Sequence, residues 1–430
     1  MARALGLDFG TTNTVVALAD GGGKTRSMPF ASTAGITDTM RTALSFMKDP
    51  LMGAQALKVE AGQAAIRQFI DNPGDCRFLQ SIKTFAASTL FQGTLVFARR
   101  HQFEDLMEIF LRRLTSYAGD AWPLDAQRIV VGRPVQFAGA SADEKLAVER
   151  YNTALTRLGF PEIHYVYEPV AAAHYFAQNL VGDATVLVAD FGGGTTDYSL
   201  IRFEREAGRL RATPVGHSGV GIAGDQFDAR IIEHLVAPEI GKGSHFRSFD
   251  KVLDVPSNYY TSFSRWNQLS IFKGSKEFAD LKSLVRSALE PEKLEAFIDL
   301  VEHDEGYPLY QAVSATKMAL SSADEAEFNF SPLGHAGRKS VRRDEFEGWI
   351  AGDLARMEGA LDEILTQTGT PASEIDKVFL TGGTSFVPAV RDIFTRRFGG
   401  EKIESGGELL SIAHGLALIG EDSDLAQWAA

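Results

Sequence analysis

LDFGTTNT at residues 7–14 and DFGGGTTDYS at residues 190–199 are the two stretches that decide the fold. Each follows a short apolar run and leads into another, which predicts a strand, a tight turn and a second strand. In both copies an aspartate ends the first strand, and an aromatic residue, glycine and paired threonines follow it. One copy in each half of the chain predicts an internal duplication, with one unit in each of two lobes.

A second pair of stretches supports the duplication. RIVVGRP at 128–134 and KVFLTGGTSFVP at 377–388 each contain an apolar strand, then glycine and a turn that ends in proline. Between the strands, apolar residues recur at helical spacing over 103–114 and, more roughly, at Leu146, Tyr151, Leu155 and Leu158. Strands that alternate with helices predict an α/β fold.

The length of 430 residues suits two lobes rather than one core. We expect residues 1–184 to form lobe I and residues 185–400 to form lobe II. The polar and aromatic stretch 243–308 predicts an inserted, mostly helical subdomain, which we place at about 228–310. Residues 401–430 predict a C-terminal helix that returns to lobe I, followed by a short tail.

The net charge of −13 argues against nucleic acid or an anionic membrane as the main partner, because phosphates repel such a surface. The single cysteine, Cys76, excludes a disulfide within the chain. The N-terminus lacks the apolar core of a signal peptide, and the sequence has no run of 18 or more apolar residues. We therefore expect a cytoplasmic protein.

The two glycine turns have the features of phosphate-binding loops. A glycine turn between two strands aims backbone N–H groups into one concavity, and threonine hydroxyls add further donors. Glycine is needed because a phosphate approaches closer than a Cβ atom allows. Another candidate, GGGKT at 21–25, lacks the first glycine of a P-loop because Leu18 stands there, so it predicts a hairpin turn.

Asp8 and Asp190 would face the same phosphates and would repel them unless a cation lay between. Magnesium takes one or two carboxylates, keeps several waters and bridges phosphate oxygens, so these aspartates predict a Mg²⁺ site. The glycine pair Gly382-Gly383 follows the strand KVFL and would let a planar ring lie against the backbone. Beside two phosphate loops, this turn predicts an adenosine site.

Together these motifs resemble the ATPase domain of DnaK-type heat-shock chaperones, within the superfamily of actin and the sugar kinases. The short form resembles YegD-type proteins, which lack the peptide-binding domain. The resemblance covers about residues 4–420 and is weakest over 243–308. It implies a two-lobed actin-like fold of duplicated ribonuclease-H-like lobes, which binds ATP or ADP with Mg²⁺ and hydrolyses ATP slowly.

The resemblance also implies roles for single residues. Asp8 and Asp190 would hold hydrated Mg²⁺, and Glu168, within VYEPVAAA, would reach the metal waters. Lys83, within SIKTF at 81–85, would orient the attacking water, with Asp197 beside that water or a potassium ion. Thr195 joins this catalytic set. The phosphate loops would comprise Gly10, Thr11, Thr12 and Asn13, and Gly192, Gly193, Gly194 and Thr195. The adenosine pocket would comprise Gly224, Asp225, Lys317, Ser321, Gly382, Gly383 and Thr384.

Some positions depart from the family pattern. Ser314 and Met318 stand where the family usually has a glutamate and an arginine, so half of its adenine clamp is missing. Phe386 replaces another arginine and could stack on the base instead. Pro134 matches the family's switch proline, but Ala142 stands in place of the surface arginine that belongs to the family's coupling to an external partner.

Four functions stay open at this point. The first is a chaperone-like ATPase whose partners are a co-chaperone, an exchange factor or a client protein. The second is a small-molecule kinase, the third a filament-forming protein of the MreB kind, and the fourth a scaffold that binds nucleotide without hydrolysing it. The sequence stops at Ala430, soon after the helix expected near 411–417. We therefore expect no peptide-binding domain and no autonomous peptide binding.

Overall fold

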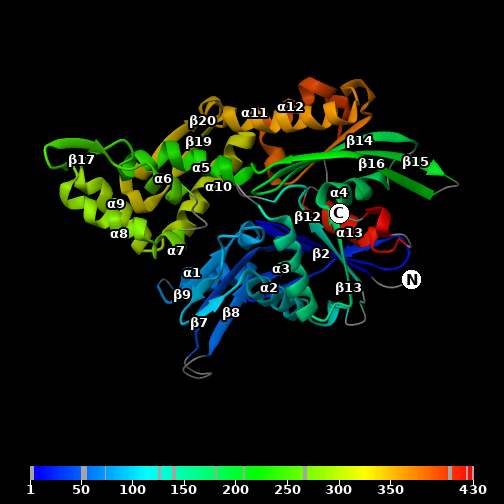
Figure 1. Ribbon diagram of the computed structural model, residues 1–430, viewed down its shortest axis with the longest axis horizontal. Coiled ribbons are helices and arrows are strands. Elements are labelled where there is room, and N and C mark those ends of the chain that lie inside the picture. Colours follow the sequence, from blue (N-terminus) through cyan, green and yellow to red (C-terminus); the bar gives the residue numbers. More distant parts are fainter. Residues whose placement is uncertain are drawn as a thin grey trace. The chain divides into compact units, whose positions relative to one another are not determined.

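The computed structural model describes residues 4–49, 56–72, 74–123, 126, 128–137, 142–178, 180, 182–206, 209–264, 269–404, 409–422 and 425–428. The chain divides into two compact units (Figure 1). The first unit comprises Met1–Gly224 and Ala355–Ala430, and the second comprises Asp225–Leu354. Four residues of the expected C-terminal tail, at 423, 424, 429 and 430, lie outside the described residues.

Two sheets with the same strand order form the centre of the first unit. In the first sheet the order is β3 (Thr25–Ser27), β2 (Asn13–Ala19), β1 (Ala4–Phe9), β12 (Arg128–Arg133) and β13 (Glu162–Tyr167), and β6 (Thr39–Arg41) also pairs with β2. In the second sheet the order is β16 (Arg209–Val220), β15 (Thr196–Glu206), β14 (Ala184–Phe191), β21 (Lys377–Thr381) and β22 (Ile403–Glu404). In both, the first three strands are antiparallel and the last two run parallel to the central one. The shared order confirms the predicted duplication and α/β fold.

The central strands of the two sheets end alike, but their partners differ at one position. Phe9 pairs with Thr14 across β1 and β2, and Phe191 pairs with Thr196 across β14 and β15. One step earlier, Asp8 pairs with Val15, whereas Asp190 pairs with a second aspartate, Asp197. The two turns are therefore equivalent in backbone but not in charge.

Helices and three small sheets complete the first unit. Apolar side chains of α2 (Phe103–Ala118) and α3 (Glu144–Arg157) pack with β1 and β12 in one core. A second core joins α4 (Glu168–Ala177) and α13 (Ser411–Ile419) to strands of both sheets. The remaining elements are α1 (Gly62–Asp71), α12 (Pro388–Phe398), β4 (Phe30–Ser32), β5 (Gly35–Thr37), β7 (Ala43–Lys48), β8 (Leu57–Ala61), β9 (Cys76–Gln80), β10 (Thr94–Val96) and β11 (Arg99–His101).

Helix α13 lies against the backbones of β1 and α4 (Figure 1). A Cβ atom at Gly415 would come within 1.8 Å of the Ala171 carbonyl oxygen, and one at Gly6 within 2.1 Å of the Ala413 carbonyl oxygen. The His414 ring is held between the hydroxyls of Thr25, at 2.6 Å, and Ser27, at 2.9 Å. Only glycine at the two crossing points allows this approach.

Glu421, two residues after the end of α13, fastens the chain there to the turn between β2 and β3. The Glu421 carboxylate accepts hydrogen bonds from the N–H groups of Gly21 and Gly23. The stretch GGGKT therefore forms the hairpin turn that the sequence predicts, and its N–H groups bind a carboxylate of the same chain.

We expect Gly415→Ala to destabilise the protein by about 3 kcal/mol or more, because its methyl group would overlap backbone that cannot rotate away. Gly359→Ala is a matched control: Gly359 is exposed on α11 (Arg343–Thr368), and a Cβ atom there meets no atom within 4 Å. The same change there should stabilise the protein by about 1 kcal/mol, since alanine favours helix. Urea unfolding of both variants measures the two effects, and equal midpoints would contradict the close packing.

The second unit combines helices with two β-hairpins. The helices are α5 (Gly224–Leu235), α6 (Asn258–Ser264), α7 (Leu269–Phe272), α8 (Lys276–Leu284), α9 (Pro291–Glu302) and α10 (Gly306–Ser322). The hairpins are β17 (His245–Ser248) with β18 (Lys251–Asp254), and β19 (Glu325–Asn329) with β20 (Arg338–Arg342). This content agrees with the mostly helical insertion expected there. Over the described ranges, every helix is too short or too polar to cross a membrane.

Candidate functional site

Four carboxylates and one lysine of the first unit form a single electrostatic cluster. Asp8 and Asp190 are the last but one residues of the central strands β1 and β14, and Asp197 on β15 pairs with Asp190. Asp190 and Asp197 are 3% and 0% exposed, so neither carboxylate is solvated by bulk water. The structure therefore brings the predicted metal ligands and the predicted Asp197 to the same ends of the two sheets.

The fourth carboxylate pairs with the lysine. Glu168 is the first residue of α4, and its Oε1 atom accepts a hydrogen bond from Lys83 Nζ at 2.5 Å. Both side chains are buried: that of Lys83 is 9% exposed and that of Glu168 is 6% exposed. Lys83 lies on a short 3₁₀ turn, η1 (Ile82–Phe85), and Gly132 leaves room for Glu168, because a Cβ atom there would lie 3.0 Å from Glu168 Cγ. Two predicted catalytic residues, distant in sequence, are thus in contact.

The three aspartates of the cluster hold their protons more tightly than free carboxylates do. Burial raises the pKa of Asp8 to about 7, with a further increase from the charge of Glu168. Burial and the same Glu168 charge raise the pKa of Asp197 to about 7, although hydrogen bonds from Gln136 N–H and the Thr195 hydroxyl oppose the shift. Burial, then Glu168 and Asp197, raise the pKa of Asp190 well above its ordinary value. One cation, Lys83, does not compensate these charges.

Lys83 itself stays charged. Burial works against its ammonium, but the Glu168 carboxylate outweighs burial and raises the pKa of Lys83 above its ordinary value. The cluster therefore carries excess negative charge at neutral pH, which favours a cation as its missing member.

Each glycine loop is braced from outside. In the first loop, residues 10–13, a Cβ atom at Gly10 would lie 2.2 Å from the Asn13 carbonyl oxygen, so the turn requires glycine. The hydroxyl of Thr42 donates to the Gly10 carbonyl at 2.7 Å, and the Thr42 N–H donates to the Thr12 carbonyl at 2.9 Å. In the second loop, residues 192–195, the Gly192 N–H closes the turn on the Thr195 carbonyl at 2.9 Å.

The predicted adenosine turn lies against the second glycine loop. Gly382 has a φ of 84°, and a Cβ atom there would lie 2.0 Å from the Phe191 carbonyl oxygen. The Thr384 hydroxyl donates to the Gly192 carbonyl at 3.2 Å. The nearby Phe386 side chain is 55% exposed, which leaves its ring accessible. Residues 382–384 therefore lie against the predicted second phosphate loop.

The other residues predicted for adenosine are divided between the two units. Gly224 closes the first stretch of the first unit, whereas Asp225, Lys317 and Ser321 belong to the second. Lys317 Nζ lies 2.5 Å from Asp228 Oδ1, and the Ser321 hydroxyl donates to the Lys317 carbonyl at 3.0 Å. The shared adenosine pocket of these residues and the turn at 382–384 stays a prediction.

Sequence reasoning missed three residues that support the site. They are Thr42, Arg150 and Tyr151. Thr42 braces the first loop. Arg150 and Tyr151 are on α3; Arg150 hydrogen-bonds to the segment that carries Lys83, and Tyr151 is within electrostatic reach of Lys83. None belongs to a glycine motif, and a lone threonine, arginine or tyrosine has no signature in sequence. The helical spacing of apolar residues places Tyr151 on the apolar face of a helix, which indicates a core residue.

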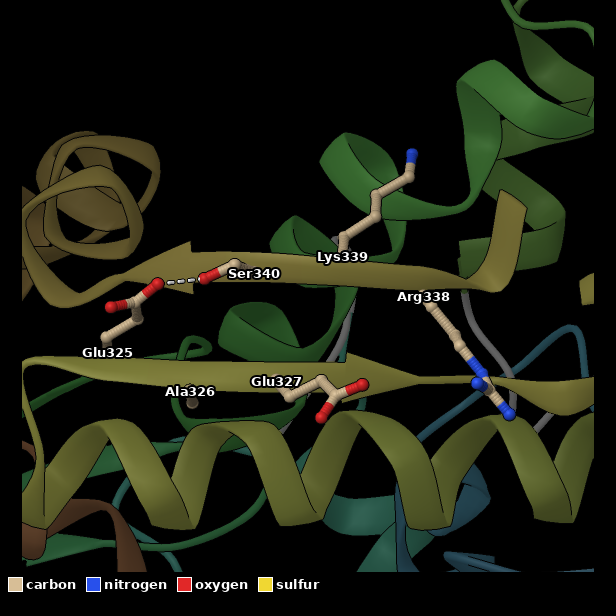
Figure 2. Close-up of a pocket in the computed structure, with 6 residues that line it drawn as sticks. All are labelled: Glu325, Ala326, Glu327, Arg338, Lys339 and Ser340. Atoms are coloured by element: carbon tan, nitrogen blue, oxygen red, sulfur yellow. Dashed lines mark hydrogen bonds between the residues drawn. The ribbon is translucent and has the colours of Figure 1, made fainter. Parts of the chain in front are cut away.

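The second unit carries a shallow hollow on its β19–β20 hairpin (Figure 2). Its lining is mostly charged and comprises Glu325, Ala326, Glu327, Arg338, Lys339 and Ser340. Glu325 accepts a hydrogen bond from Ser340, and Lys339 bonds to Glu239 at 2.7 Å. The hollow contains none of the residues predicted to bind nucleotide.

The family comparison agrees with this geometry. A model of the family described as Hsp70 protein matches residues 146–246 and 280–421, more than half of the chain. The matched residues include Glu168, the second glycine loop and the turn at 382–384. The resemblance predicts one site for Asp8, Asp190, Lys83 and Glu168 beside the two glycine loops, and of these four residues the matched segments include Asp190 and Glu168. The chain belongs to the Hsp70 family and is an ATP-binding ATPase of the chaperone type.

Proposed function

We propose that this chain binds ATP with Mg²⁺ at the two glycine loops and hydrolyses the nucleotide slowly, with water as the acceptor. One observation carries the proposal: Asp8, Asp190 and Asp197 are close enough to the buried Lys83–Glu168 pair to interact with it electrostatically, and loops rich in backbone N–H groups follow Asp8 and Asp190. We further propose that the lobes follow the boundaries 1–184 and 185–400, with 401–430 returning to lobe I.

The residues present suit a hydrated magnesium ion. Carboxylate oxygens are the ligands that this ion prefers, and two of them suffice when waters and phosphate oxygens fill the other positions. Among the described residues, no group of three or more histidine, cysteine, aspartate or glutamate side chains has the geometry of a metal site. We therefore assign Asp8 and Asp190 as its protein ligands, and the ion would offset the charge of the phosphates and carboxylates.

The chain's own groups position the reactants. N–H groups of residues 10–13 and 192–195 would bind phosphate oxygens, and the Thr195 hydroxyl would add a donor. Lys83 would turn from Glu168 towards the terminal phosphate and orient water. The Asp197 Oδ2 atom is buried and has no hydrogen bond from any described residue, and it would accept one from that water.

The reaction itself needs little covalent assistance. The water oxygen bonds to the γ-phosphorus, the bond from that phosphorus to the β–γ bridging oxygen breaks, and ADP, phosphate and a proton leave. Phosphoryl transfer depends mainly on positioning and charge neutralisation, so a strong general base is not required. A raised pKa for Asp197 nevertheless lets this carboxylate take up the proton near neutral pH.

Turnover by the purified protein tests the proposal. We expect ATP hydrolysis at a low rate, with no added acceptor, and its loss in excess chelator. A rate that rises strongly only when a polyol or sugar is supplied would favour the small-molecule kinase instead. Nucleotide binding by calorimetry without any turnover would favour the scaffold, and no binding at all would reject the proposal.

The partners stay a separate proposal. Family membership supports interaction with a co-chaperone, an exchange factor or a client protein, and we propose this class rather than nucleic acid or membrane. The YegD-type subclass, which the sequence resembles, is a finer assignment within the family and stays part of this proposal. Pull-down with the purified chain in ATP and in ADP would identify partners whose binding depends on the nucleotide.

A further inference from the structure

Helix α3 holds the backbone of the lysine-bearing segment. The Arg150 guanidinium donates hydrogen bonds to four carbonyl oxygens that follow Lys83, with distances between 2.8 and 3.1 Å, and these belong to Phe85, Ala86, Ser88 and Phe91. At the start of the same helix, the Asp143 N–H donates to the Ala87 carbonyl at 2.9 Å. The path of residues 85–91 is therefore set by α3.

The next residue on α3, Tyr151, lies in an aromatic cage. Its ring stacks on Phe103, with centroids 5.6 Å apart and an interplanar angle of 8°. It meets Phe9 edge-on at 5.9 Å and Phe137 at 6.3 Å. Phe9 directly follows Asp8, so the ring is locked beside the end of β1. Tyr151 is 1% exposed, and the position of its hydroxyl is fixed by packing.

The hydroxyl of Tyr151 is buried without a hydrogen-bond partner among the described residues. Such a group costs free energy in a folded protein, so its presence in a core calls for an explanation. The charges that act on the hydroxyl include those of Lys83, Glu168, Asp8 and Arg133, so it lies within electrostatic reach of the predicted catalytic cluster. A phenylalanine would fill the same cage without this cost.

We propose that Tyr151 is a positioning residue for Lys83, and that its hydroxyl oxygen accepts a hydrogen bond from the ammonium when Lys83 turns from Glu168 towards a bound nucleotide. The inference rests on the proposed function, because only a nucleotide phosphate gives Lys83 a reason to leave Glu168. It extends that function to a residue on α3, outside every nucleotide motif of the chain.

The chemistry of the groups explains why a hydroxyl is needed there. A lysine ammonium has three N–H donors, and in this structure one of them is directed at Glu168 Oε1. When the ammonium turns to a phosphate, the bond to Glu168 is lost and a buried donor would face apolar rings. A fixed hydroxyl beside those rings accepts that donor and limits the rotamers open to Lys83. The same contact satisfies the hydroxyl.

Tyr151→Phe tests the inference, since it removes one oxygen and keeps the ring. We expect the single-turnover rate of hydrolysis to fall about 10-fold or more. This is the scale seen when a residue that hydrogen-bonds to a metal ligand is replaced. Calorimetry should show Mg-ATP affinity within about 2-fold of wild type. A merely structural role would lower thermal stability or affinity and leave the rate in the bound complex unchanged, which would overturn the inference.

Tyr165→Phe is the matched control. Tyr165 lies on β13 near Tyr151, with ring centroids 6.4 Å apart, but its hydroxyl bonds to Asn152 at 2.8 Å. We expect its loss to leave turnover unchanged.

A spectroscopic readout is independent of activity. In protein labelled with 3-fluorotyrosine, the ¹⁹F signal missing from Tyr151→Phe belongs to residue 151. Mg-ADP with beryllium fluoride, which imitates the terminal phosphate, should shift this signal in wild type and not in Lys83→Ala. A shift of the same size in both proteins would overturn the contact.

The two levels of the proposal fail separately. If wild type neither binds nor hydrolyses ATP, the proposed function fails and the role of Tyr151 falls with it. If Lys83→Ala loses turnover but Tyr151→Phe keeps the wild-type rate, only the role of Tyr151 is rejected.

Discussion

Lys83→Ala should lower the single-turnover rate of ATP hydrolysis by about 10²-fold or more, the effect typical of removing one preorganised contact to the transition state. The reason is structural: among the charges that act on the Asp8, Asp190 and Asp197 carboxylates, Lys83 is the cation. Binding of Mg-ATP should change much less, because the two glycine loops and the metal supply most contacts to the phosphates. Rapid-quench measurement with enzyme in excess separates the two quantities.

A second ion pair provides the control. Lys242 Nζ lies 2.5 Å from Glu233 Oε1 in the second unit, so Lys242→Ala also breaks a close lysine–glutamate pair. We expect this variant to turn over ATP at the wild-type rate. Rates for Lys83→Ala that match those of Lys242→Ala would remove Lys83 from the catalytic set.

Asp190→Asn should weaken Mg-ATP binding by more than about 10²-fold, since even outer partners of a metal contribute about 10- to 100-fold to its affinity. Asparagine keeps the size of the side chain but loses the charge that attracts the ion. Calorimetry with Mg-ATP, and with ATP in excess chelator, should show a large loss for the first ligand and little for the second. Equal affinity of both proteins for Mg-ATP would exclude Asp190 as a ligand.

The same substitution should stabilise the nucleotide-free protein at alkaline pH, by about 2 °C in Tm. Burial and neighbouring carboxylates raise the pKa of Asp190, so its charged form destabilises the native state. Between its unfolded and folded pKa values the native state binds more protons than the unfolded state, and stability therefore falls as pH rises through this window. The advantage of Asp190→Asn should be largest at pH 8 and vanish near pH 4. An advantage that does not vary with pH would contradict the raised pKa.

The fold could be predicted because its two halves repeat the same pattern of apolar strands separated by glycine turns. Glycine at position 10, and again at 192, marks a turn whose flanking strands are apolar, and such turns have few alternatives. The equal strand order of the two sheets follows from that repetition. The predicted groups at Asp8, Asp190 and Glu168 also meet, because strand ends and a helix start fix their backbones.

Other parts of the site leave no signal in sequence. Thr42, between β6 and β7, hydrogen-bonds to the first loop, and no sequence motif around Thr42 predicts this contact. Tyr151 is predicted to be a core residue from its helical spacing, which is correct for its ring but silent about its hydroxyl. The pairing of Lys317 with Asp228 is likewise a tertiary contact between α10 and α5. Side-chain partners between distant elements depend on packing that no local pattern encodes.

Helix α13 also constrains the order in which the protein can fold during its synthesis. The helix packs on β1, although some 400 residues separate the two in sequence. The ribosome must therefore synthesise almost the whole described chain before β1 gains this neighbour. Until then the apolar residues of β2, β12 and α4 that pack with α13 lack their cover. Contacts of such long sequence separation form slowly, and an uncovered sheet is prone to aggregate. A protein of the chaperone type would thus itself pass through a nascent state that other chaperones recognise.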